Sequence, residues 1–122
     1  DPDGRPVMSA FMEVPRLSDL EGLPVEVVSS DEPGVVSLTS WANDGSIVTL
    51  TWDETAGSVH VRWTEADEER LVLERETVSK VSVREDHGRI EFWIWSDAGG
   101  VVGQLLVRVG DHVGVSDALL RR

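Results

Sequence analysis

Three histidines and many carboxylates are the side chains that could serve in catalysis or metal binding. His60, His87 and His112 show none of the close spacings, such as H-E-x-x-H, that bring two ligands to one metal ion. The 122 residues include no cysteine and 23 Asp and Glu, so thiolate ligands are absent and chance alone brings some carboxylates together. Neither a G-x-S-x-G nucleophile motif nor a lysine-bearing phosphate loop occurs. We therefore expect no catalytic residue, no metal site and no cofactor, and we expect binding rather than catalysis.

The most informative candidate binding residues lie in the alternating segment 89–96, RIEFWIWS. Its large apolar side chains occupy both faces, so if one set faces a core, Glu91, Trp93 and Trp95 face outward. One face of a small antiparallel sheet normally meets water, and the two tryptophans would then form an exposed recognition site flanked by Arg84 and Arg108 of neighbouring strands. The alternative is that apolar N-terminal residues or a C-terminal helix cover this face.

Acidic side chains form the second candidate surface. The formal net charge is −12, and residues 1–61 account for −9 of it, with eleven acids against two arginines. Four acids stand together in one predicted turn: Glu65, Asp67, Glu68 and Glu69. Alternate turns of an antiparallel meander share one end of the sheet, so Asp44 and this run would form a negative rim that attracts a cationic partner. The alternative is that these charges only keep the hairpin tips solvated.

β-Strands must position these side chains, because apolar and polar residues alternate along most of the chain. Valine alone occurs 20 times, and β-branched residues suit a pleated surface. Turns rich in Asp, Asn and Gly recur every 10 to 12 residues, and these connections are too short for helical crossovers. The pattern predicts an all-β antiparallel meander of about 7–8 strands, forming a small barrel, roll or sandwich. The expected strands are 25–29, 35–41, 46–52, 58–64, 70–75, 78–84, 89–96 and 101–109.

Three tryptophans recur every 11 residues in this meander: Trp41, Trp52 and Trp63. Successive strands run in opposite directions, so Trp41 and Trp63 are expected near one end of the sheet and Trp52 near the other.

Two short helical pieces are expected near the ends of the chain. Residues 18–21 match the S-x-x-E capping box and predict a short N-terminal helical turn. Ser116 would cap a short C-terminal helix over 117–120, with two arginines near its end to complement the helix dipole. Residues 1–7 are expected to be a flexible arm or a cloning remnant, and residues 8–122 a single β domain.

Charge and composition narrow the class of partner. A surface this acidic repels nucleic acid and anionic membranes, whereas a basic protein complements it. No apolar run reaches the roughly 18 residues that a membrane-spanning helix needs. Arginine outnumbers lysine ten to one, which is typical of a GC-rich bacterial genome. We expect a cytoplasmic location, with secretion left open.

The leading hypothesis is a non-catalytic acidic binding domain that recognises a basic protein, in the manner of a bacterial immunity or inhibitor protein. One alternative is a small-ligand-binding β-barrel or roll, including an enzymatic one. Another is an interaction module built like a pleckstrin-homology roll. An exposed edge strand would in addition permit a homodimer.

Overall fold

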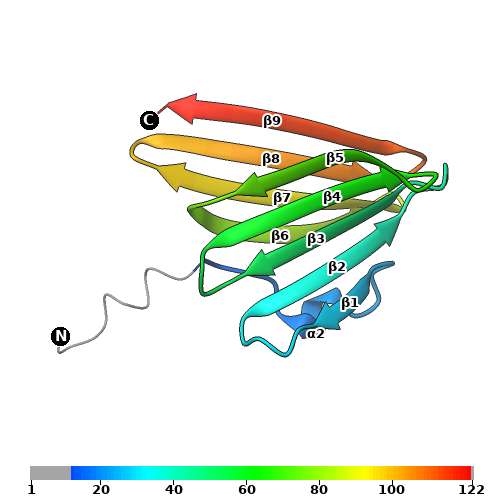
Figure 1. The fold of residues 1–122 in the computed structure, drawn as a ribbon, viewed down its shortest axis with the longest axis horizontal. Helices are drawn as coiled ribbons and strands as arrows, with labels where there is room; N and C mark the ends of the chain where they lie inside the picture. The colour runs from blue at the N-terminus through cyan, green and yellow to red at the C-terminus, as the bar shows by residue number, and fades with distance from the viewer. Residues whose placement is uncertain (1–11, 122) are drawn as a thin grey trace.

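The chain folds into β-strands joined by short turns, and the computed structural model describes residues 12–121 (Figure 1). Within these residues, one helical turn, α2 (Leu17–Leu20), precedes nine strands. The strands are β1 (Glu26–Ser29), β2 (Val35–Trp41), β3 (Ile47–Asp53), β4 (Ser58–Glu65), β5 (Glu68–Arg75), β6 (Val78–Asp86), β7 (Arg89–Ala98), β8 (Val101–Val109) and β9 (Val113–Arg121). The described part of the chain has no helix long and apolar enough to cross a membrane.

The strands form two antiparallel sheets in which sequence neighbours pair. One sheet has five strands in the order β1-β2-β3-β4-β5, and the other has four in the order β6-β7-β8-β9. The predicted all-β antiparallel meander is confirmed, with nine strands in place of seven or eight. Of the arrangements expected, two open sheets are observed, and the described strands make no closed barrel.

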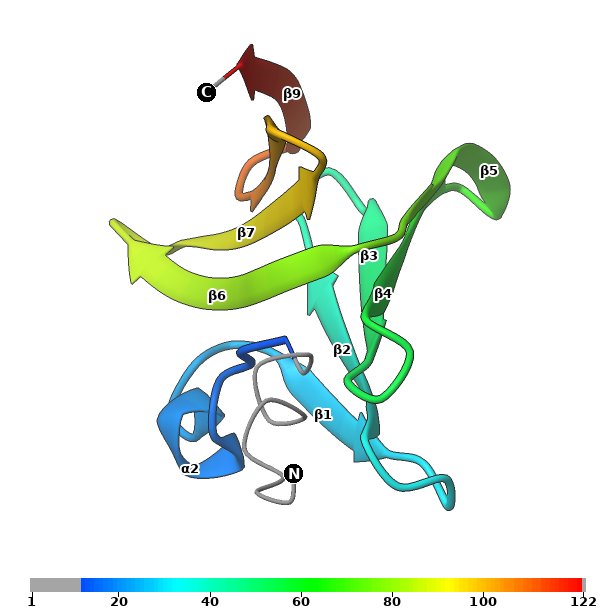
Figure 2. The ribbon, with the colours of Figure 1, turned by 90° about the vertical axis from the view of Figure 1, so that its left-hand side faces the viewer.

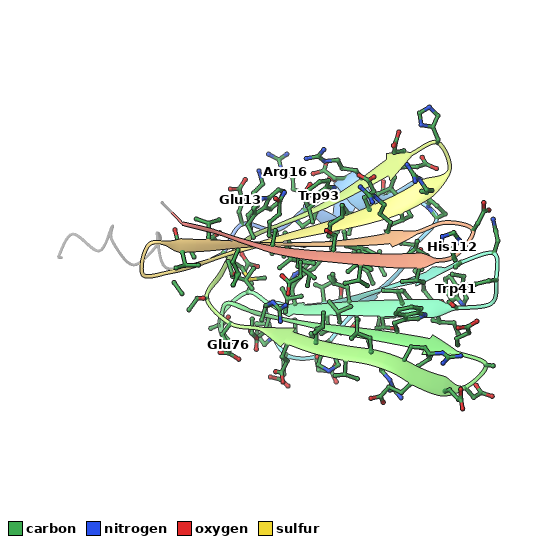
Figure 3. The ribbon with its side chains drawn as sticks, turned by 90° about the horizontal axis from the view of Figure 1, so that it is seen from above. Glu13, Arg16, Trp41, Glu76, Trp93 and His112 are labelled. Carbon is green, nitrogen blue, oxygen red and sulfur yellow. The ribbon has the colours of Figure 1, made fainter. Side chains whose placement is uncertain are left out.

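The two sheets form two layers with one apolar cluster shared between them (Figure 2 and Figure 3). Trp52 and Leu50 of β3 and Phe92 and Ile94 of β7 are among its most buried members. Burial alternates along β3, so its second, fourth and sixth residues face the core and its others face away. The alternating sequence pattern therefore sets which side chains remain on the two outer faces.

The N-terminal segment packs beside β6. Met12 and Leu20 are buried in the shared core, and Glu13 forms a parallel bridge to Lys80 of β6. The predicted helical turn is confirmed as α2, but its N-cap is Arg16, without a side-chain cap bond, so Ser18 does not act as the cap. The expectation for residues 1–7 lies outside the described residues.

The predicted C-terminal helix is wrong, because the chain forms strand β9 there. Every residue from Val113 to Arg121 pairs with β8. β8 contributes the buried Leu105 and Val107 to the core, and a helix at the C-terminus would leave its outer edge unpaired. The β8–β9 hydrogen-bond ladder spans nine residues and stabilises the chain more than a helix cap at Ser116 would, since a cap contributes only about 1 kcal/mol.

Candidate functional site

Trp93 and Trp95 lie on the outer face of β7, as the alternation predicts. Their ring centroids are 5.9 Å apart with planes at 14°, so the indoles stack. Both side chains are half-buried. The Arg84 guanidinium carbon lies 5.1 Å from the Trp93 ring centroid, and Lys80 Nζ lies 5.5 Å from that of Trp95. The stack is therefore flanked by two cations of β6, of which sequence reasoning identified only Arg84.

Glu91 joins the same cluster and is only 8 % exposed. Its Oε1 accepts a hydrogen bond from Trp93 Nε1 at 3.1 Å, and its Oε2 lies 3.6 Å from Arg108 Nε. A nearly buried carboxylate needs such partners to offset its lost hydration. Glu91 thus holds Trp93 in place and links β7 to β8.

Neither alternative cover for this face is observed in the described chain. The C-terminal residues form β9 within the same sheet, and the described N-terminal segment buries Met12 and Leu20 in the core. The described contacts of the tryptophan rings are with each other and with Lys80 and Arg84 of the same sheet.

Two of the acidic turns lie at the same end of the molecule, and the β1–β2 and β3–β4 turns, which are also acidic, lie at the opposite end. Asp44 lies in the β2–β3 turn and Asp67 in the β4–β5 turn, and the register that pairs Ile47 with both Trp41 and Thr64 places these turns at the same end. The β8–β9 turn joins them, because Asn43 Nδ2 donates to Asp111 Oδ1 at 2.8 Å. The expected grouping of Asp44 with residues 65–69 is confirmed. Asp111 also belongs to this group, which the sequence does not indicate because it lies far along the chain from the other acidic residues of the group.

The carboxylates of this acidic end differ in how far they are neutralised. Arg70 lies 3.2 Å from Glu65 and 3.8 Å from Glu68, and Arg62 lies 3.6 Å from Glu69. Within the described chain, Asp44, Asp67 and Asp111 have no ion pair of this kind. These three aspartates therefore carry most of the uncompensated negative charge of this end.

Asp44 is held in its ionised form. The backbone N–H of Ser46 donates to Asp44 Oδ1 at 2.8 Å, and this bond lowers the pKa of the carboxyl below its ordinary value. The nearby His112 lowers the pKa further when it is protonated. Asp44 consequently keeps its charge, and with it the turn geometry, to lower pH than an unperturbed aspartate.

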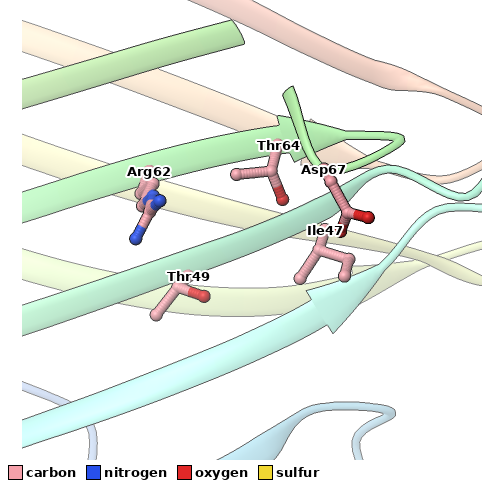
Figure 4. A pocket seen from close by; sticks show the side chains of 5 residues that line it. All are labelled: Ile47, Thr49, Arg62, Thr64 and Asp67. Atoms are coloured by element: carbon pink, nitrogen blue, oxygen red, sulfur yellow. The ribbon is translucent and has the colours of Figure 1, made fainter. Parts of the chain in front are cut away.

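Two exposed apolar side chains border the acidic end. Trp41 is 53 % exposed, and Ile47 pairs directly with it across β2 and β3. Beside Ile47 lies a shallow depression of about 270 Å³, lined also by Thr49, Arg62, Thr64 and Asp67 (Figure 4). Aromatic and apolar side chains set within a charged rim are typical of protein recognition surfaces.

The 11-residue tryptophan spacing predicted the position of Trp41 but not its exposure. As expected, Trp41 and Trp63 lie toward one end of the sheet and Trp52 lies toward the other. Trp52 is buried in the core and Trp63 packs against it, whereas Trp41 is on the outer face. Trp41 and Ile47 are thus binding candidates that sequence reasoning missed, because alternation alone does not say which outer-face residues stay uncovered.

No described cluster of His, Cys, Asp and Glu side chains has the three members needed to hold a metal ion. His87 lies in the exposed β6–β7 turn beside Asp86, with 2.8 Å between Nδ1 and Oδ1. His112 is exposed in the β8–β9 turn, and His60 lies half-buried on β4. The three histidines therefore occupy separate places in the described fold.

Comparison with known proteins identifies a structural neighbour. No protein-family model matches the sequence, and no curated protein matches it significantly. The fold is similar to one chain of a contact-dependent growth inhibition toxin–immunity protein complex from Klebsiella pneumoniae 342. The TM-score is 0.73 at 15 % sequence identity, covering 90 % of this chain and 98 % of that chain. At this identity the likeness establishes the fold, which is that of a chain found in a protein–protein complex.

Proposed function

We propose that this chain is a non-catalytic binding domain that recognises a basic protein, and that it acts as a bacterial immunity protein by neutralising a toxin. The observation that carries the proposal is the acidic end, where the turns of Asp44, Asp67 and Asp111 lie at the same end of the molecule as the exposed Trp41 and Ile47. The structural neighbour supports it, since that chain belongs to a toxin–immunity protein complex.

The acidic end suits a basic partner for two physical reasons. Its uncompensated carboxylates attract a cationic surface over a distance and speed association. Trp41 then supplies a large rigid contact area, and truncating such an aromatic anchor typically costs about 2 kcal/mol or more of binding free energy. The acidic turns would therefore speed association and orient the partner. Trp41 and Ile47 would slow dissociation of the complex.

The stacked tryptophans are a less suitable anchor for the same partner. Lys80 and Arg84 stand next to them, and these cations would repel a basic surface. We therefore rank Trp41 above Trp93 and Trp95 as the contact residue.

The direct test uses the protein encoded next to this chain's gene as the binding probe. Titration calorimetry at 50 and 300 mM NaCl measures the affinity and its salt dependence. We expect binding that weakens with salt, and a loss of at least about tenfold for Trp41→Ala. In the host bacterium, co-production of the chain should restore growth that the neighbouring protein arrests.

Two exposed glutamates provide a matched pair of charge reversals. Glu68 lies at the acidic end, and Glu76 follows β5 at the opposite end, across the molecule from Trp41 (Figure 3). We expect Glu68→Lys to slow association and weaken binding, and Glu76→Lys to change neither by more than about twofold. Equal effects of the two reversals, or an affinity indifferent to salt, would exclude the acidic end as the binding surface.

A further inference from the structure

In the part of the chain that the structure describes, strand β9 is an unprotected sheet edge. It is nine residues long, lies at the end of the four-stranded sheet and pairs with β8 on one side only (Figure 1). A free edge presents unpaired N–H and C=O groups, and proteins normally blunt such edges with charges, short strands or a covering segment.

The other three sheet edges of the described chain have such protection. β1 has only four residues, and β5 carries five charged residues among its eight. The edge of β6 is covered by the N-terminal segment, since Glu13 N donates to Ser79 O at 2.9 Å and Val81 N donates to Glu13 O at 2.8 Å. β9 has no comparable cover, and among its described side chains only Asp117 is charged.

The inner face of β9 becomes progressively exposed along the strand. Val113 is buried, Val115 is 37 % exposed and Leu119 is 75 % exposed. Asp117 lies between the last two on the same face and forms an ion pair with Arg75 of β5, which ties the two sheets together. The edge therefore offers two apolar side chains on either side of an already neutralised carboxylate.

We infer that β9 is the interface of a homodimer, in which two copies join antiparallel through this edge into one eight-stranded sheet. An antiparallel register centred on Asp117 places Val115 of each copy opposite Leu119 of the other. The two Asp117 side chains then face each other, each with its own Arg75. In this register the backbone hydrogen-bonding groups of one β9 edge match those of the other, and the apolar side chains of the two copies meet.

The charge at the β9 edge favours pairing with a second copy of this chain over pairing with a basic partner. The Arg75–Asp117 pair leaves the middle of this edge neutral, so nothing there attracts a cationic surface. An antiparallel dimer also holds the two acidic ends apart, because the eight-residue step from Val113 to Arg121 spans about 27 Å at 3.4 Å per residue. That separation exceeds the Debye length of about 8 Å at physiological salt, so the repulsion between the two ends is screened.

Sedimentation velocity of the full chain between about 1 and 200 µM tests the dimer, and a contact made through one strand edge of each copy predicts dissociation in the micromolar range. We expect Leu119→Lys and Val115→Lys to weaken self-association at least tenfold. Val72→Lys on β5 and Val28→Lys on β1 are matched controls, since both valines are exposed on other edge strands, and we expect no change. Circular dichroism verifies that each variant is folded.

Hydrogen exchange locates the interface independently. Amide protection of residues 113–119 should rise with protein concentration, while protection of β1 and β5 should not. A monomer at every concentration, a dimer that survives both β9 variants, or a dimer without concentration-dependent protection in β9 would overturn the inference. The glutamate reversals at the two ends of the five-stranded sheet test the acidic end separately, so the two proposals can fail independently.

Discussion

At the scale of single residues, alternation predicts which face a side chain occupies but not which neighbours it meets. The sequence placed Trp93 and Trp95 outward correctly. Lys80 pairs with Trp95 because the β6–β7 turn sets one continuous register along β6 as far as Lys80. The bulge between Val78 and Lys80 lies beyond that pair and shifts only the pairing of Val78. The cation beside the second tryptophan therefore follows from the turn that sets the register, and alternation alone does not identify it.

The β4–β5 turn holds a residue whose type conflicts with its backbone conformation. Ala66 has φ of 52° and Asp67 has φ of 64°, the left-handed conformation that a two-residue hairpin loop requires. Asparagine tolerates this region better than alanine does. We expect Ala66→Asn to raise the free energy of unfolding by about 0.5–1 kcal/mol, measured by urea denaturation.

Ala56 is the matched control for this substitution. It is also an exposed turn alanine, but it does not have a positive φ. Ala56→Asn should bring no gain in stability. If both variants behave alike, strain at Ala66 is not the cause of the effect.

At the scale of elements, the C-terminal residues show why local sequence signals were insufficient to choose between a helix and a strand. Ser116 and the terminal arginines satisfy the rules for a helix, and nothing nearby in sequence argues against one. The C-terminal residues form a strand because the edge of β8 needs a hydrogen-bonding partner. A helix rule that considers only the residues around Ser116 does not take this tertiary pairing into account. By contrast, the strands from β2 to β8 were predicted well, because tight turns and alternation are local features.

The outer face of the four-stranded sheet depends on Glu91, which links β7 to β8. Replacing Glu91 with alanine leaves the Trp93 N–H and the Arg108 guanidinium without their acceptor, and we expect a loss of about 1–3 kcal/mol of unfolding free energy. Glu91→Gln keeps an acceptor oxygen for Trp93 and should cost less. Near-ultraviolet circular dichroism reports the Trp93–Trp95 stack and should weaken in the alanine variant.

Glu85 is the control for this element. It lies exposed on β6, and Glu85→Ala should change stability by no more than about 0.5 kcal/mol. A Glu91→Ala variant as stable as Glu85→Ala, with an unchanged near-ultraviolet spectrum, would show that Glu91 does not hold the stack.

At the scale of the whole molecule, charge is divided between the two sheets. Residues 12–77 carry fifteen acids and four arginines, a net of −11, whereas residues 78–121 carry six acids and five bases, a net of −1. The sequence showed a more acidic first half and predicted that its alternate turns share one end, but only the fold shows that this half forms one sheet. The binding proposal belongs to this sheet and the dimer proposal to the other.

So uneven a charge must oppose folding, because the compact state brings the acids of the first sheet closer together than the unfolded chain does. Added salt screens this repulsion, so we expect the melting temperature to rise by roughly 2–6 °C between 10 and 200 mM NaCl, which corresponds to about 0.5–1 kcal/mol.

Asp67→Asn removes one uncompensated charge and keeps a residue that tolerates positive φ, so it should raise the melting temperature at 10 mM NaCl and reduce the salt increment. Glu85→Gln, on the nearly neutral sheet, should do neither. A melting temperature that falls with salt would mean that the ion pairs of Arg62, Arg70 and Arg75 outweigh the repulsion, and the acidic end would then be a balanced network rather than a surface poised for a cationic partner.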